Sequence, residues 1–185
     1  LSLHDALPIY AVDCFDYAFS VNVMEHVNDV ASVIEKVGKS LAGGAGYRFT
    51  CPNYLFPYEP HFNMPTLFSK RLTERMLGRM IFASRNVTDP SGTWKSLNWI
   101  NVVQIKRVVR GVSGLRVVFN RSMFPSTLER IASDTEFAGR RSPTIRGLIL
   151  LLVRLRLHFL FGLIPAALQP IIDCRIEKSA ELEAR

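Results

Sequence analysis

Apolar residues along the chain follow two periods, and these predict an alternation of strands and helices. Residues 15–23 (FDYAFSVNV) are rich in β-branched and aromatic residues and predict a buried strand. Apolar positions over 30–41 recur at helical spacing, and Asn28 or Asp29 stands where it can cap that helix. Two glycines at 43–44 predict the end of the helix.

A second strand is predicted over 46–51 (GYRFTC), closed by Pro52 and Asn53. A strand, a helix and a second strand with short connections form one right-handed parallel crossover unit. The pattern therefore predicts an α/β fold.

The remaining pattern predicts further elements. They are a basic helix over 67–81, a loop over 83–97, a helix over 98–110, a strand over 115–123, a short helix over 126–133 and a final strand over 171–178. Residues 145–164 are the most apolar stretch and predict one helix. Arg154 and Arg156 near its centre argue against a membrane span. Two roles stay open, a helix lying on a membrane and a helix lining a substrate pocket.

Composition narrows the class of protein. The chain has 185 residues, 48% of them hydrophobic and 21% charged, which excludes a disordered tail, a collagen-like fibre and a coiled coil. The three cysteines are too few for a disulfide scaffold and lack metal-ligand spacing. We expect them to be buried, reduced strand residues in a cytoplasmic protein that has no metal site.

The net charge of +7 is concentrated in the middle of the chain, where residues 67–156 carry 17 Lys and Arg against 5 Asp and Glu. Such a region attracts nucleic acid, anionic lipid or a phosphorylated acceptor, or it is simply a solvated basic face. No recognition motif with interleaved aromatic residues accompanies it, so we expect no specific nucleic-acid partner.

An ordered set of motifs spans residues 15–53. It runs Phe15-Asp16, an apolar strand, Glu25-His26-Val27, an amphipathic helix, Leu41 to Gly44, a strand and Pro52-Asn53. This order resembles the second half of a class I S-adenosylmethionine (SAM)-dependent methyltransferase domain of the methyltransferase-11 type. The segments EPHFNMP at 59–65 and WKSLNW at 94–99 are similar to that type as well.

The resemblance implies a Rossmann-like fold with a mostly parallel sheet and added helices. Residues 15–23, 46–51 and 115–123 would be its fourth, fifth and sixth strands, and 171–178 an antiparallel seventh. The family holds SAM with a glycine-rich loop after its first strand and an acidic residue after its second. Neither occurs here, because the glycines at 43–46 follow a helix and precede a strand.

We therefore expect the C-terminal part of a bacterial-type methyltransferase, a fragment inactive alone. Residues 10–185 would be the truncated domain, with 53–110 and 124–168 as substrate-side or lid insertions. The first nine residues, LSLHDALPI, resemble a translated sequencing adapter and are set aside as an artefact.

The resemblance also implies a cofactor wall, in which Ser20, Val21 and Asn22 line the methionine end of SAM. Glu25 and His26 follow a strand's carboxyl end, where open α/β sheets bind ligands. One of them faces the substrate as a catalytic group, or else it caps the following helix or bonds to the loop backbone.

A Pro- and aromatic-rich loop over 53–65 supplies the substrate-side candidates Asn53, Tyr58 and His61. His61 either closes over a substrate or packs the loop, and a turn explains Asn53 equally well. His158, on an apolar helix, is interpreted as a core or interface histidine.

Two hypotheses follow from these patterns. The first is transfer of a methyl group from SAM to a small-molecule, sugar or lipid-linked acceptor. The second is a non-catalytic peripheral membrane or interaction protein, built on the basic middle and the apolar helix over 145–164.

Overall fold

The computed structural model describes residues 12–67, 69–139 and 143–180. Its main sheet has the order β1-β2-β6-β5, formed by β1 (Phe15–Val21), β2 (Leu41–Pro52), β6 (Ile171–Lys178) and β5 (Leu115–Phe119). β1 is parallel to β2, and β6 is antiparallel to both β2 and β5. The predicted α/β class, with a mostly parallel sheet and an antiparallel last strand, is confirmed.

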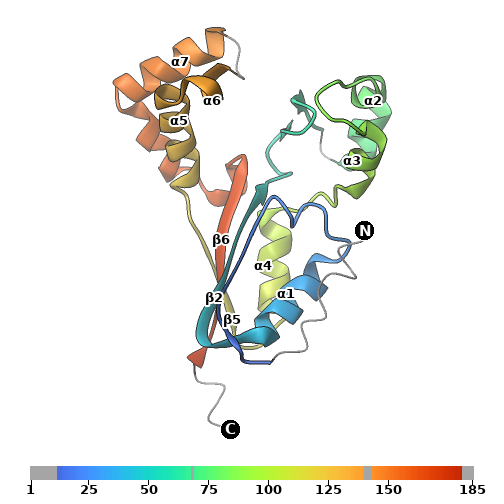
Figure 1. The fold of residues 1–185 in the computed structure, drawn as a ribbon, viewed down its shortest axis with the longest axis vertical. Coiled ribbons are helices and arrows are strands. Elements are labelled where there is room, and N and C mark those ends of the chain that lie inside the picture. Colours follow the sequence, from blue (N-terminus) through green and yellow to red (C-terminus); the bar gives the residue numbers. More distant parts are fainter. Residues whose placement is uncertain (1–11, 68, 140–142, 181–185) are drawn as a thin grey trace.

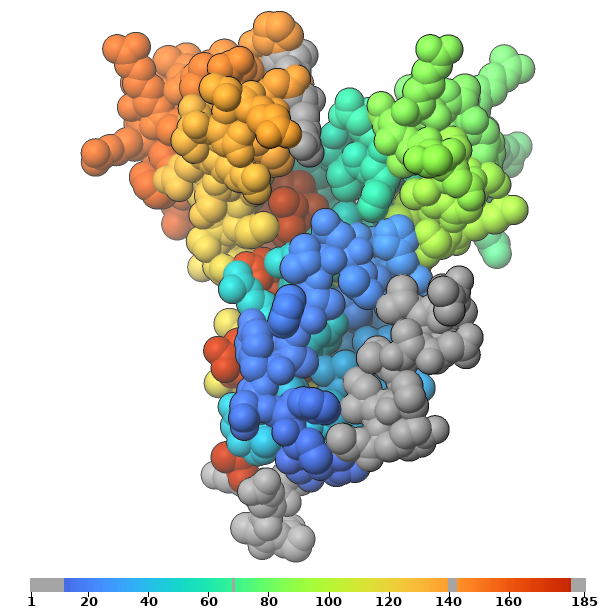
Figure 2. Space-filling model, in the orientation of Figure 1, coloured from blue at the N-terminus to red at the C-terminus, as the bar shows by residue number. Residues whose placement is uncertain are grey.

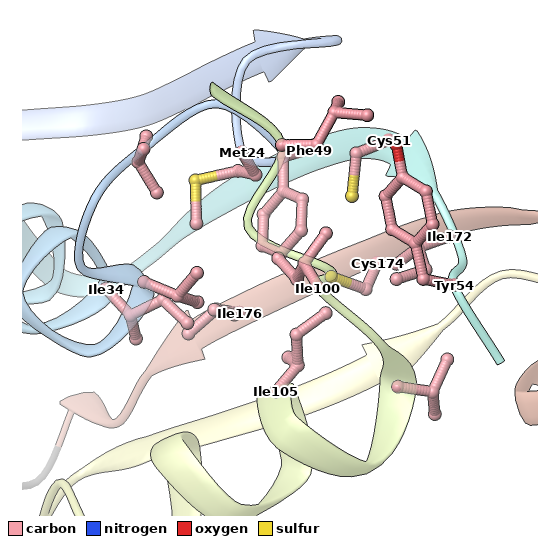
Figure 3. Close-up of a cluster of buried hydrophobic side chains, with 14 of the residues drawn as sticks. Met24, Ile34, Phe49, Cys51, Tyr54, Ile100, Ile105, Ile172, Cys174 and Ile176 are labelled. Carbon is pink, nitrogen blue, oxygen red and sulfur yellow. The ribbon is translucent and has the colours of Figure 1, made fainter. Parts of the chain in front are cut away.

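One face of the sheet carries the core. Helices α1 (Val30–Ser40) and α4 (Val102–Arg110) contact each other and cover this face (Figure 1). Figure 3 shows Phe49 and Cys51 of β2 beside Cys174 and Ile176 of β6, with Ile105 of α4 facing them. Burial of these apolar side chains, each worth roughly 1.5–3 kcal/mol, fixes the strands on which the candidate site stands.

β1 is an exposed strand, so the prediction of a buried strand over 15–23 was wrong. Phe15, Tyr17, Phe19 and Val21 alternate along it and are 47–74% exposed. They lie on the sheet face opposite α1 and α4, where Phe19 stands beside Arg48 of β2. Sequence composition predicts a strand here, but burial depends on a covering layer that the described residues do not supply.

Two groups of helices stand at one end of the sheet, and a notch opens between them in the space-filling view (Figure 2). The first holds the hairpin β3 (Tyr58–Glu59) and β4 (Met64–Pro65), with α2 (Lys70–Phe82) and α3 (Pro90–Ser96). The second comprises α5 (Met123–Ser133), α6 (Thr135–Gly139), α7 (Pro143–Arg154) and the short helices η1 (Leu157–Leu163) and η2 (Ala166–Leu168). We call these the α2–α3 lobe and the α5–η1 lobe.

α1 ends at Ser40, so glycines 43–44 do not terminate it as predicted. They lie inside β2, which begins at Leu41. The register with β1 shifts between Phe15 and Tyr17, and Gly44 adopts φ +81° at this irregularity. A side chain is disfavoured at that backbone angle, so glycine serves the strand here rather than the helix end.

The predicted loop over 83–97 contains a helix, α3. Asp89 caps it by accepting a hydrogen bond from the Gly92 amide at 2.9 Å, and Pro90 is its first residue. The sequence Asp-Pro-Ser-Gly is typical of turns and also of helix N-termini, so a loop was predicted where a helix begins. In α2, Met76 and Met80 are exposed, and Leu77 is partly buried against the core.

The predicted helix over 145–164 is broken. α7 ends at Arg154, and Arg156 takes a left-handed conformation (φ +57°) before η1 begins. β5 is likewise shorter than the predicted 115–123, and Met123 begins α5. Among the described residues, none of the helices has the length and apolar character that crossing a membrane requires.

The cysteines separate into two kinds. Cys51 and Cys174 are buried as predicted, and burial raises the pKa of both thiols. Cys14 is exposed, contrary to the prediction, because it precedes the uncovered strand β1. The adapter-like residues 1–9 lie outside the described residues.

Candidate active site

The turn after β1 is held by one asparagine from a distant segment. Asn98 donates from Nδ2 to the carbonyl oxygens of Met24 and Val27, at 2.7 Å each, and its amide donates to the Glu25 carbonyl at 2.8 Å. These three bonds fix the backbone on both sides of Glu25 and His26. The turn lies beyond the carboxyl end of β1, where ligands bind in open α/β sheets.

Glu25 is fully buried, and its carboxylate has no hydrogen-bond partner among the described residues. Burial raises the pKa of this carboxyl group. The Nε2 atom of His26 lies 3.9 Å from Oε1 of Glu25. The helix-capping alternative is wrong for Glu25, because Asp29 caps α1 by accepting from the Ser32 amide at 3.0 Å.

His26 has a defined tautomer. Its Nδ1 lies 2.8 Å from Ser96 Oγ, and the Ser96 hydroxyl donates to the Thr93 carbonyl at 2.8 Å. Because that hydroxyl proton is used, Ser96 Oγ accepts and His26 Nδ1 donates. Burial lowers the pKa of His26 and favours its neutral form. Neutral His26 therefore carries a lone pair on Nε2.

His61 is held by a buried carboxylate. Glu59 is fully buried and accepts from His61 Nδ1 at 2.6 Å, from the Tyr54 hydroxyl at 3.1 Å and from the Phe62 amide at 2.7 Å. The hydrogen bond to Glu59 raises the pKa of His61, against the opposing effect of burial. In the neutral form, His61 also presents its Nε2 lone pair.

Three segments bring these groups together. The rings of His26 and His61 meet edge to face with centroids 5.4 Å apart. One ligand atom from each of Glu25, His26 and His61 lies within 4.8 Å of the other two. We call this set the Glu25–His26–His61 cluster. Both histidine side chains remain 25% exposed, so the cluster is reachable from solvent.

Aromatic rings pack beside this cluster. Tyr54, which bonds to Glu59, stacks on Trp99 at a centroid distance of 4.4 Å, and Trp99 meets Trp94 edge to face at 5.5 Å. Trp94 is fully buried and sits on α3, two residues before Ser96. The rings therefore fix the segment that orients His26.

The three residues assigned to the cofactor wall lie at the carboxyl end of β1. Val21 is 60% exposed, and Asn22 is exposed with φ +53°. Ser20 is partly buried, and its hydroxyl pairs with the Tyr47 hydroxyl at 2.7 Å. These residues can contact one end of an extended ligand, while the described residues contain no glycine-rich strand–loop–helix to hold its other end.

The other two substrate-side candidates make hydrogen bonds to residues outside the cluster. Asn53 is fully buried, and its Nδ2 donates to carbonyls of the η2 segment, at 3.0 Å to Ala167 and 2.8 Å to Gln169. This amide joins β2 to the α5–η1 lobe. Tyr58 lies in the hairpin, and its hydroxyl donates to Asn63 at 2.6 Å.

His158 is a buried histidine as predicted. Its Nε2 lies 2.9 Å from Glu129 on α5. It therefore belongs to the packing of the α5–η1 lobe.

Sequence reasoning missed the residues that hold the cluster: Tyr54, Glu59, Ser96 and Asn98. Three of them lie in the segments 59–65 and 94–99, which carried the looser part of the family resemblance. The sequence pattern that could have indicated them is a polar residue among aromatic neighbours. This pattern does not show which atoms the polar side chain contacts.

Comparison with known proteins gives two kinds of relative. The uncharacterized protein Rv1509 of Mycobacterium tuberculosis strain H37Rv is 48% identical over 164 residues, 89% of this chain and 56% of the relative. Its counterpart from strain CDC 1551 matches equally. The chain thus spans a little over half the length of these relatives. No protein-family model matches the chain.

Among solved structures, a SAM-dependent methyltransferase from Mesorhizobium loti superposes with a TM-score of 0.50. It is 12% identical, and the match covers 90% of this chain and 63% of the other. The similarity is one of fold, and it agrees with the order and directions of the four strands.

Proposed function

We propose that this chain is the C-terminal part of a SAM-dependent methyltransferase that acts on a small-molecule, sugar or lipid-linked acceptor. The observation that carries the proposal is the Glu25–His26–His61 cluster at the carboxyl ends of β1 and β2, in a sheet of methyltransferase topology. The greater length of the relatives supports the expectation that further segments complete the cofactor site.

SAM would contact Ser20, Val21 and Asn22 with its methionine end. When bound, it supplies a methyl group on a positively charged sulfur, which an acceptor nucleophile attacks in line. The exposed Val21 and Asn22 fit such a contact, and Ser20 is held by Tyr47.

The acceptor would bind beside the cluster, with its hydroxyl or amine toward His26. His26 is suited to act as a general base, because its neutral form has a free lone pair on Nε2 and Nδ1 is fixed by Ser96. Glu25, 3.9 Å from that nitrogen, would stabilise the positive charge that the imidazole gains. His61 and Tyr58 would then contact the acceptor from the 53–65 loop.

The α2–α3 lobe and the α5–η1 lobe would enclose the acceptor as substrate-side insertions. The notch between them opens at one end of the sheet (Figures 1 and 2). Enclosure of this kind excludes water and orients the nucleophile, which accounts for much of the rate in group transfer.

A second candidate function rests on the surface of α7 and η1. The exposed apolar side chains there are Ile145, Leu148, Leu150, Leu151, Leu155, Leu157, Phe159, Leu160 and Leu163. Arg146, Arg154 and Arg156 are exposed among them. Apolar side chains with interspersed arginines favour an anionic membrane surface, either as the sole function or as the route to a lipid-linked acceptor.

The test uses the longer protein that contains this chain, incubated with SAM and with small-molecule, sugar and lipid extracts. Release of S-adenosylhomocysteine is measured. We expect release with one acceptor class, and the His26→Gln variant should lower kcat by about 10²–10⁴-fold. The Glu35→Gln variant, at an exposed carboxylate on α1, serves as the control.

Absence of turnover with every extract, together with absence of SAM affinity, would contradict the methyltransferase proposal. Co-sedimentation with anionic liposomes that requires residues 143–163 would then favour the membrane or interaction protein. Turnover with the lipid extract together with such co-sedimentation would assign both properties to one enzyme.

A further inference from the structure

We propose that the Glu25–His26–His61 cluster binds one divalent transition-metal ion of the zinc type. One ligand atom from each residue converges there: a carboxylate oxygen of Glu25, which has no hydrogen-bond partner among the described residues, and a ring nitrogen of each histidine. For His26 the nitrogen facing Glu25 is Nε2. The binding itself does not depend on methyl transfer, and it is measured directly.

The burial of the Glu25 carboxylate favours a bound cation. A fully buried carboxylate with no hydrogen-bond donor is costly, because a buried charge needs a partner. The described residues place no hydrogen-bond donor on either of its oxygens, and the Nδ1 atoms of His26 and His61 are bonded elsewhere. A cation placed between the three groups would satisfy all of them at once.

The hydrogen bonds that orient His26 and His61 also favour a metal ion. Histidines that bind metals commonly donate their other ring N–H to a carboxylate or another acceptor, which fixes the tautomer and the ring direction. His61 donates to the buried Glu59 at 2.6 Å, and His26 donates to Ser96 Oγ at 2.8 Å. Both rings are thus oriented with Nε2 free for a ligand.

The donor set selects the kind of ion. Two imidazole nitrogens and one carboxylate suit zinc, cobalt, nickel or iron, whereas magnesium and calcium prefer oxygen ligands throughout. Three protein ligands leave a coordination position open, as in catalytic zinc sites. The partial exposure of both histidines gives the ion a path from solvent.

The cluster would contract slightly on binding. Ligand atoms around a tetrahedral zinc ion are roughly 3.4 Å apart, given bonds of about 2.0–2.1 Å. The Glu25 Oε1 to His26 Nε2 separation is 3.9 Å, and one ligand atom from each of the three residues lies within 4.8 Å of the other two. Small side-chain rotations close these gaps, while Asn98 and Glu59 keep the backbone and His61 in place.

An ion here would also change the chemistry of the site. Metal and proton compete for the same lone pairs, so the metal-bound form does not use His26 as a base. An acceptor hydroxyl at the open position would instead lose its proton more readily, because a divalent ion lowers the pKa of bound oxygen groups. This consequence rests on the proposed function, whereas metal binding does not.

The test is titration of the metal-depleted 185-residue chain with Co²⁺, followed by visible absorption, and with Zn²⁺, followed by calorimetry. We expect one ion per chain with micromolar or tighter affinity, and d–d bands of a four- or five-coordinate cobalt ion. Circular dichroism of every variant checks that it is folded.

Two variants test the geometry. Ser96→Ala removes an exposed hydroxyl and should weaken binding about 10–100-fold, as loss of an outer hydrogen-bond partner does. Glu25→Gln removes a ligand and should weaken it further and change the cobalt spectrum. Ser91→Ala on the same helix and Glu35→Gln on α1 are the matched controls and should bind as the parent chain does.

Absence of stoichiometric binding by the folded parent chain would overturn the proposal. So would equal affinity and equal cobalt spectra in the parent, Ser96→Ala and Glu25→Gln chains, which would mean that the ion binds elsewhere. Binding that persists in the controls and declines in the order Ser96→Ala, then Glu25→Gln, would establish the site.

Discussion

Two side chains near the cluster show how single polar residues organise it. Ser96 uses its proton on the Thr93 carbonyl, which forces His26 to donate from Nδ1. Asn98 donates both side-chain N–H groups to carbonyl oxygens of the turn that carries Glu25 and His26. Neither residue contacts a ligand in the proposed mechanism, yet the direction of the His26 lone pair depends on Ser96, and the backbone that carries His26 depends on Asn98.

We predict that Asn98→Ala lowers the free energy of unfolding by about 1–3 kcal/mol, because it leaves the buried carbonyls of Met24 and Val27 without their donors. Urea denaturation followed by circular dichroism measures the loss. Asn86→Ala, which removes one side-chain bond to the Phe62 carbonyl, should cost less. An equal or smaller loss at Asn98 would contradict the role given to it.

The elements show where periodicity succeeds and where it fails. The stripe over 30–41 predicts α1 to within a residue, because an amphipathic helix against a sheet needs that spacing. The apolar run over 145–164 predicts one helix, but the chain turns at Arg156 so that α7 and η1 both pack on α5. Hydrophobic periodicity cannot predict such a break, because no residue in the local sequence requires one.

The break at Arg156 leads to a second prediction. A left-handed backbone costs roughly 1–2 kcal/mol for a residue with a side chain and far less for glycine. Arg156→Gly should therefore leave the free energy of unfolding unchanged or raise it slightly. Arg146→Gly, inside α7, should lower it by about 1 kcal/mol.

Chemical denaturation of the two glycine variants checks this. Unfolding is followed by far-ultraviolet circular dichroism, because the α5–η1 lobe contains no tryptophan whose fluorescence could report on it. A loss at Arg156→Gly as large as that at Arg146→Gly would mean that the left-handed turn is absent in solution.

At the scale of the whole molecule, the strands and their directions were predictable, and the exposure of β1 was not. The family resemblance implied four strands with the last one antiparallel to its neighbours, and the structure confirms these directions. Burial of Phe19 depends on which segments cover that face of the sheet, which no local pattern encodes. The cluster depends on contacts between segments 35 and 70 positions apart, so the sequence predicted Glu25, His26 and His61 as separate candidates but not that they meet.

Among the described residues, β1 pairs only with β2, so its other edge presents unpaired backbone groups beside exposed Tyr17 and Phe19. Such an edge promotes association between chains. We predict that the 185-residue chain self-associates and that the double variant Tyr17→Lys, Phe19→Lys shifts it toward monomer in gel filtration with light scattering. Val118→Lys, on β5 at the far side of the sheet, should have little effect. A monomeric parent chain would contradict this.

The most direct test of the central proposal is a calorimetric titration of SAM into two proteins, the 185-residue chain and the longer protein of which we propose it is the C-terminal part. We predict micromolar affinity for the longer protein and no measurable binding by the chain alone, because the described residues offer only the Ser20–Asn22 wall. Micromolar binding by the 185-residue chain, or no binding by the longer protein, would contradict the proposal.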